Sequence, residues 1–166
     1  IDRGIIGRVY HLDIFAPHRL NAPTRPSWFW KRRDTGGIIT DIGSHQIEQF
    51  LEFSGCADTK IISARAKNYF HQEYPEFDDF GDVMLESANG ITGYIRVDWM
   101  SPEGIKTFGD LRMTILGEKG FIELKKNCEN PPLLTSISSN CIIYNTLCSS
   151  FNISILSPYS HFSAIY

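Results

Sequence analysis

A carboxylate and an imidazole stand four residues apart within residues 36–46, which are Gly-Gly-Ile-Ile-Thr-Asp-Ile-Gly-Ser-His-Gln. They belong to Asp41 and His45. Side chains at positions i and i+4 lie on the same face of an α-helix. A helix that begins here, with Thr40 or Asp41 as its N-cap, therefore presents both groups together. No other stretch of the sequence assembles groups capable of chemistry in this way.

The residues alone allow other roles for this pair. Asp41 and His45 would supply four metal ligands together with His11 and His18, but the spacing fixes no third ligand, so we expect no metal site. A structural role is also open, in which Asp41 caps the helix and His45 lies on its solvated face.

Apolar residues with helical spacing place the helix at residues 41–54. Ile47, Phe50 and Leu51 stand at i, i+3 and i+4, and Ile42 precedes them. Gly55 follows as a natural stop. The polar side of this helix would carry Asp41, His45, Glu48, Gln49 and Glu52.

A long loop precedes the helix. Its three prolines, Pro17, Pro23 and Pro26, argue against a regular helix or a central strand in residues 16–35. Long loops in compact domains often carry function. This one holds residues that suit a binding site, namely Arg19, Asn21, Arg25, Trp28, Trp30, Lys31, Arg32 and Arg33. A surface loop whose tryptophans pack on the sheet is an equally supported alternative.

Strand patterns dominate the rest of the first 126 residues. They predict strands at residues 7–15, 60–70, 80–87, 91–101, 110–116 and 121–125. Asn89-Gly90 predicts a hairpin turn between two of them, and Glu118-Lys119-Gly120 predicts another. One strand, a loop, a helix and then a strand meander indicate an α+β fold. We expect a mostly antiparallel open sheet with the helix packed on one face.

Alternation within two strands predicts which side chains share a face. In the first strand, one face would carry Val9, His11, Asp13 and Phe15, and the other Tyr10, Leu12 and Ile14. In residues 91–101, Ile95, Val97 and Trp99 would lie opposite Tyr94, Arg96, Asp98 and Met100. A face that carries Tyr, Arg and Met suits contact with a partner, although solvation of that face is the simpler alternative.

Composition excludes several classes of protein. The net charge of −3 and the pI of about 5.9 argue against nucleic-acid binding, and no apolar run is long enough to cross a membrane. The start of the chain has neither an initiator Met nor a signal-peptide pattern, which is typical of the interior of a longer chain. The four cysteines (Cys56, Cys128, Cys141 and Cys148) follow no disulfide or zinc spacing. A cytoplasmic location is expected.

The last forty residues differ from the rest. No Asp, Glu, Lys or Arg occurs in residues 131–166, whereas charged residues make up 21% of the chain. We therefore divide the chain into a domain at residues 1–126 and an atypical tail at residues 127–166, uncharged except for Glu129. A shifted reading frame after Lys126 would explain such a tail.

Residues 4–126 resemble the C-terminal domain of the glucose–fructose oxidoreductase, inositol dehydrogenase and rhizopine-catabolism (Gfo/Idh/MocA) family of NAD(P)-dependent oxidoreductases. The resemblance rests on a G-G-x-x-x-D-x-G-x-H pattern formed by Gly36, Gly37, Asp41, Gly43 and His45. Residues 4–9 and 114–120 strengthen it.

The resemblance implies a role for each part of the domain. His45 would be the acid/base that takes the proton of a substrate hydroxyl, and Asp41 would position the substrate or tune His45. A histidine near its intrinsic pKa exchanges protons around neutral pH, which fits this role. The substrate would be a sugar, polyol or cyclitol, with Arg19, Asn21, Arg25 and Trp28 as its contacts. The sheet would form a homodimer or higher homo-oligomer.

The cofactor part of the family pattern is missing. No G-x-G-x-x-G occurs, and Glu118-Lys119 is followed by Gly120 and not by the proline of the family's catalytic E-K-P motif. NAD or NADP would belong to the full-length family enzyme, and we expect none to bind this chain alone. The chain would then be inactive in isolation. A non-enzymatic dimerisation or binding module derived from the family is the alternative.

Overall fold

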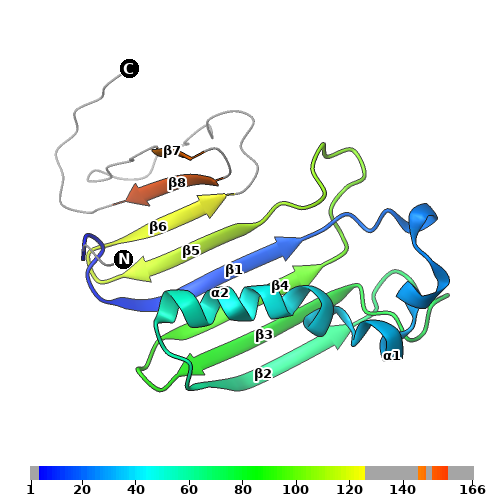
Figure 1. Cartoon of the computed structure of the whole chain (residues 1–166), viewed down its shortest axis with the longest axis horizontal. Helices are drawn as coiled ribbons and strands as arrows, with labels where there is room; N and C mark the ends of the chain where they lie inside the picture. The colour runs from blue at the N-terminus through cyan, green and yellow to red at the C-terminus, as the bar shows by residue number, and fades with distance from the viewer. Residues whose placement is uncertain (1–3, 126–145, 149–150, 157–166) are drawn as a thin grey trace.

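A computed structural model describes residues 4–125, 146–148 and 151–156 (Figure 1). Its strands form one sheet in the order β2-β3-β4-β1-β5-β6-β8-β7. Their bounds are β1 Val9–Pro17, β2 Thr59–Lys67, β3 Phe80–Ser87, β4 Thr92–Asp98, β5 Arg112–Gly117, β6 Gly120–Lys125, β7 Thr146–Cys148 and β8 Phe151–Leu156. Only β1 and β4 pair in parallel; the other neighbouring pairs are antiparallel. The helix α2 (Ser44–Ser54) lies across one face, as Figure 1 shows, so the expected α+β fold is confirmed.

The central strand β1 carries a bulge that reverses one prediction. Val9 pairs with Gly117 and His11 with Leu116, so Tyr10 is an extra residue between them. Val9 is consequently buried with Leu12, whereas Tyr10 is half-exposed at 50%. The prediction that Val9 shares the face of His11 was wrong, because simple alternation does not survive a bulge.

Strand β4 follows the predicted alternation. Ile95, Val97 and Trp99 are buried on the side of the helix, and Tyr94 and Arg96 are half-buried on the other. Asp98 lies on the face of Arg96 as predicted, with its Oδ2 3.3 Å from Nε of Arg96, but it is covered there and only 5% exposed. Its Oδ1 accepts a hydrogen bond from the backbone N–H of Met100, where the strand has already ended.

The helix starts earlier than predicted and in a different conformation. A π-helical turn, η3 (Ile39–Gly43), precedes α2, and no side chain caps either segment. The backbone N–H groups of Thr40 and Asp41 both bond the carbonyl oxygen of Gly37. The prediction of Thr40 or Asp41 as the N-cap was therefore wrong, because both residues lie inside the first turn. Gly55 ends the helix as predicted, at a φ of 64°.

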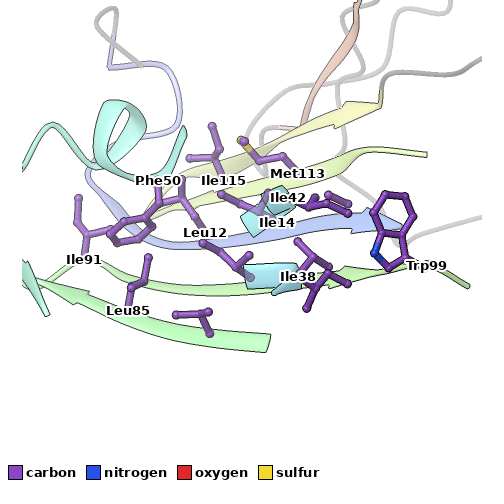
Figure 2. Close-up of a cluster of buried hydrophobic side chains, with 14 of the residues drawn as sticks. Leu12, Ile14, Ile38, Ile42, Phe50, Leu85, Ile91, Trp99, Met113 and Ile115 are labelled. Carbon is purple, nitrogen blue, oxygen red and sulfur yellow. The ribbon is translucent and has the colours of Figure 1, made fainter. Parts of the chain in front are cut away.

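The core lies between α2 and the sheet (Figure 2). Phe50 of α2 is fully buried, and a Cβ on Gly93 of β4 would lie 2.5 Å from two of its ring carbons. Glycine at this position therefore allows the phenylalanine ring to rest directly on the strand. In Figure 2, Phe50 and Trp99 lie at opposite ends of the cluster. None of the helices in the described residues has the length and apolar character needed to cross a membrane.

The loop between β1 and α2 contains only short helical turns. They are η1 (Ala22–Thr24), η2 (Ser27–Trp30) and α1 (Arg32–Thr35). Trp30 stacks on Tyr74 with the ring centroids 3.8 Å apart, whereas Trp28 is 53% exposed. One tryptophan is thus a packing residue and the other is available for contact.

Two strands lie in the uncharged tail. β8 pairs with β6, and β7 pairs with β8, both antiparallel. The rest of residues 127–166, including the proposed frame shift after Lys126, lies outside the described residues.

Candidate functional site

A cavity of about 650 Å³ lies at the N-terminal end of α2. Three segments form its wall. The helical segment contributes Asp41, Ile42, His45, Gln46 and Gln49. The loop after β1 contributes His18, Arg25, Trp28 and Phe29, and the connection from β4 to β5 contributes Trp99, Thr107, Phe108, Gly109 and Leu111. Four residues selected from the sequence, Arg25, Trp28, Asp41 and His45, are therefore brought to one cavity.

Asp41 and His45 both line the cavity with exposed side chains. Asp41 lies within the π-helical turn η3 and His45 lies in the first turn of α2, so the two residues belong to consecutive helical segments. Within residues 4–125, no hydrogen bond or ion pair joins the two side chains. The wall thus offers a carboxylate and an imidazole that are both available to a bound molecule.

Gly36 and Gly37 form the turn that precedes the helical part of this wall. Gly36 and Gly37 have φ values of 76° and 82°, a region that other residues rarely adopt. A Cβ on Gly37 would also lie 2.8 Å from Oδ2 of Asp78. The two glycines thus permit the left-handed turn and the close approach of Asp78 to the backbone.

Asp78, which lies just before β3, packs against the same turn. Its side chain is 4% exposed, and Oδ1 accepts a hydrogen bond of 2.6 Å from Nη2 of Arg32. Burial raises the pKa of the Asp78 carboxyl, and the positive charge of Arg32 opposes this shift. Asp78 and Arg32 together link the helix α1 to the strand that underlies η3.

Arg25 is a partly buried cation surrounded by aromatic rings. Its Cζ lies 4.3 Å from the ring centroid of Phe29, 4.8 Å from that of Trp99 and 5.7 Å from that of Phe108. Nε donates a 2.7 Å hydrogen bond to the carbonyl oxygen of Leu20. Burial lowers the pKa of the guanidinium, and the negative charge of Asp41 acts in the opposite direction.

Two glutamines on α2 bring amide groups to the cavity. Gln46 is 5% exposed, and its residue type alone predicted no role for it. The buried Oε1 atoms of Gln46 and Gln49 accept no hydrogen bond in the described part of the chain. Buried polar groups are nearly always hydrogen-bonded, so these carbonyls favour a bound molecule that carries hydroxyl donors. The i, i+3 spacing of the glutamines on α2 was the available sequence signal.

His18 lines the cavity and Arg19 does not, because neighbouring side chains of an extended chain point to opposite sides. Nδ1 of His18 donates to the carbonyl oxygen of Ala16 over 2.8 Å. Arg19 donates instead to the carbonyl oxygen of Glu103 over 3.3 Å. The segment that contains Glu103 is held by backbone bonds to residues 17–19.

Asn21 also makes contacts that support the fold of the loop. It adopts the left-handed conformation, with φ at 50°, before η1. Its backbone N–H donates to Oε1 of Glu103 over 3.0 Å. The structure thus places neither Arg19 nor Asn21 at the cavity, so the prediction that they contact the substrate together with Arg25 and Trp28 is not supported by their positions. Where residues 4–125 are concerned, no group of three or more His, Cys, Asp or Glu side chains could hold a metal ion, and His11 bonds Thr92 and Asp13 instead.

Comparison with known proteins identifies the domain. The family model of the GFO/IDH/MocA C-terminal domain matches residues 1–123. The chain belongs to this family. A protein named as an oxidoreductase from Erwinia carotovora atroseptica SCRI1043 shares 43% identity with a TM-score of 0.75, over 92% of this chain and 44% of its own. No match was found among the curated proteins.

More distant solved structures share the fold of this domain. GenD2 from gentamicin A biosynthesis, solved in complex with NAD, is 23% identical with a TM-score of 0.63, over 75% of this chain and 34% of its own. Levoglucosan dehydrogenase, solved with NADH and levoglucosan, is 22% identical with a TM-score of 0.62 and the same two coverages. The chain thus spans less than half the length of the relatives that it matches.

The residues present do not fit the pyrophosphate of a dinucleotide. Such a group binds at a glycine-rich turn between a strand and a helix of a parallel sheet. The sequence contains no G-x-G-x-x-G, and the parallel pair β1–β4 is not joined by a single crossover helix. What the domain offers is a cavity wall with polar groups.

Proposed function

We propose that this chain is the substrate-binding and oligomerisation domain of an NAD(P)-dependent oxidoreductase that acts on a sugar, polyol or cyclitol. The observation that carries the proposal is that Asp41, His45 and two glutamine side chains all line one cavity of a Gfo/Idh/MocA domain. The buried carbonyl oxygens of these glutamines have no hydrogen-bond partner among the described residues. Relatives of the same fold were solved with levoglucosan and with L-sorbose, which supports a carbohydrate ligand.

The proposed chemistry of this chain is a proton transfer. His45 takes the proton of the substrate hydroxyl, since its exposed ring reaches the cavity and an imidazole exchanges protons near neutral pH. Asp41 binds a neighbouring hydroxyl or stabilises the imidazolium that forms. NAD(P), held outside this chain, would supply the hydride acceptor. Without that partner, the isolated chain binds substrate and does not turn it over.

Histidine-ring NMR of the 166-residue chain tests the binding step. Addition of a binding sugar or cyclitol is expected to shift the ring resonances of His18 and His45, which line the cavity. The rings of His11 and His71 are internal controls, because they bond Thr92 and Asp79 outside the cavity wall. Asp41→Asn should weaken the shifts, and Glu52→Gln on the exposed side of α2 should not. If no member of a broad panel moves His18 or His45, the proposal is wrong.

The gene tests the enzymatic part of the proposal. An open frame upstream of Ile1 that encodes G-x-G-x-x-G and a later E-K-P would supply the dinucleotide site and the catalytic lysine. If the upstream sequence contains no such frame, the enzymatic proposal is wrong and the non-enzymatic module is favoured. A cytoplasmic setting is part of the same proposal, and finding the Cys56 thiol oxidised in native protein would count against it.

A second candidate, a dimerisation module without catalysis, is supported by the sheet face opposite α2. We define this open face by Tyr10, Asp82, Met84, Tyr94 and Arg96 of β1, β3 and β4. Tyr10 and Met84 are about half exposed, at 50% and 49%. An aromatic and apolar surface interleaved with charges suits a homo-oligomeric interface. Oligomerisation through this face is compatible with both candidates.

A further inference from the structure

We propose that Arg25 selects a substrate that carries a carboxylate, so that the ligand of this cavity is a sugar acid and not a neutral sugar. The inference rests on the proposed carbohydrate-binding function and adds the charge of the ligand to it. It starts from how the guanidinium is surrounded.

Arg25 has more donors than the protein satisfies. A guanidinium carries five N–H donors, and the only hydrogen bond of the Arg25 side chain within residues 4–125 runs from Nε to Leu20. Nη2 is buried and has no partner there. The three aromatic rings compensate part of the charge, but they offer no lone pair to the N–H edge. Nη1 and Nη2 therefore lack an acceptor among the described residues.

Arg25 also lacks a direct counter-ion within the described residues. Other arginines of the domain form ion pairs with a named carboxylate, such as Arg32 with Asp78, whereas Arg25 forms none. Asp41 influences it only through the longer-range field. A partly buried cation without a hydrogen-bonded anion is costly. A carboxylate matches the planar fork of a guanidinium and can accept two hydrogen bonds from it.

The charges of the cavity wall favour a ligand with one negative charge over a ligand with two. Arg25 is the only Lys or Arg in the described wall, and Asp41 is its only carboxylate. With neutral histidines, Arg25 and Asp41 bring the formal charge of the wall to zero, so a bound carboxylate leaves a total charge of −1 and a dianionic phosphate leaves −2 beside Asp41. The carbonyl oxygens of Gln46 and Gln49 remain for hydroxyl donors of the same ligand.

Saturation-transfer NMR with matched ligands tests the assignment on the 166-residue chain. D-glucose, D-glucuronate and D-glucose 6-phosphate differ only at C6, and the galactose and mannose series extend the panel. The carboxylate member is expected to bind about tenfold more tightly than its neutral partner, as for a hydrogen bond to a charged group. Arg25→Gln should remove this preference. Arg19→Gln, which changes an arginine outside the cavity, should keep it.

Each alternative outcome has a distinct meaning. Equal binding of neutral and carboxylate sugars overturns the inference and leaves the carbohydrate function intact, whereas binding of neither overturns both. Tighter binding of the phosphate overturns the carboxylate assignment. A preference that persists in Arg25→Gln also contradicts the inference, provided that circular dichroism shows the variant folded. Arg25→Lys keeps the charge but loses the planar fork, so it should retain only part of the preference.

Discussion

The contact between Phe50 and Gly93 gives a quantitative test of how α2 is seated on the sheet. Replacing Gly93 by Ala adds a Cβ that would lie 2.5 Å from Cδ2 and Cε2 of Phe50. Contacts of this kind cost about 1–3 kcal/mol, because the ring must shift within a filled core. The same substitution returns about 0.4–1 kcal/mol by restricting the unfolded chain. The middle of the two ranges gives an expected net loss of about 1–2 kcal/mol.

Thermal unfolding followed by circular dichroism measures this loss. For a chain of this size, a change of about 1 kcal/mol shifts Tm by about 2–4 °C, so Gly93→Ala should lower Tm by about 2–8 °C. Gly104→Ala is the matched control, since a Cβ added there would meet nothing within 4 Å and the φ of Gly104 is not positive. The control should stabilise the chain by about 0.4–1 kcal/mol, because only the restriction of the unfolded chain acts there.

A double-mutant cycle decides whether Phe50 is the cause. Phe50→Leu should destabilise the chain by itself, because a fully buried ring is lost. In the Phe50→Leu background the added methyl group has more room, so Gly93→Ala should cost less there than it does beside the phenylalanine. If Gly93→Ala is as stable as the original chain, or if the two effects simply add, the close packing of α2 on β4 is wrong.

Four further outcomes follow from the structure. The folded-state pKa of Asp78 is raised, so its contribution to stability is present below the unfolded pKa of about 3.9 and is lost as pH rises through the folded value. Chemical denaturation at several pH values should therefore show the free energy of unfolding of Asp78→Asn rising relative to that of the original chain over this window. A change of opposite sign refutes the buried carboxylate. NAD or NADP titrated into the 166-residue chain in a calorimeter should give no saturable isotherm, because the glycine-rich turn is missing from the sequence. Met84→Asp on the open face should shift an oligomer toward monomer in sedimentation velocity, whereas Glu48→Gln on the exposed side of α2 should not; an unchanged distribution in both would place the interface elsewhere. Translation of the coding DNA after Lys126 in the other two frames should yield a charged, strand-patterned continuation, and its absence from both frames contradicts the proposed frame shift.

The sequence predicted those features that local residue chemistry determines. Asn89-Gly90 marks the hairpin between β3 and β4, where Gly90 has a φ of 83°, and Gly55 marks the end of α2. Helical spacing identified Phe50 as a core residue. These features depend on a few adjacent residues, which is why they could be recognised without a three-dimensional structure.

The remaining features depend on tertiary contacts. The bulge at Tyr10 and the π-helical turn at η3 each involve one residue more than a regular pattern allows, and a regular hydrophobic period does not reveal the extra position. The far wall of the cavity comes from Thr107 and Phe108, which lie more than sixty positions from His45 and carry no motif. Arg19 and Asn21 were grouped with Arg25 by composition, but the direction of the chain beyond β1 separates them.

The π-helical turn has a consequence for how the wall of the cavity could change without unfolding. A π turn holds one residue more than an α-helical turn, so residues before η3 are offset by about 100° from the positions that a continuous α-helix would give them. Phe50 and Gly93 hold the helix on the sheet beyond the turn, while Gly37 and Asp78 hold the chain before it. Loss of Ile42 or Gly43, which lie between the two residues, would therefore swing Asp41 around the helix axis and leave His45 in place. The carboxylate and the imidazole are thus set by two separate anchors, and this single turn determines their relative angle.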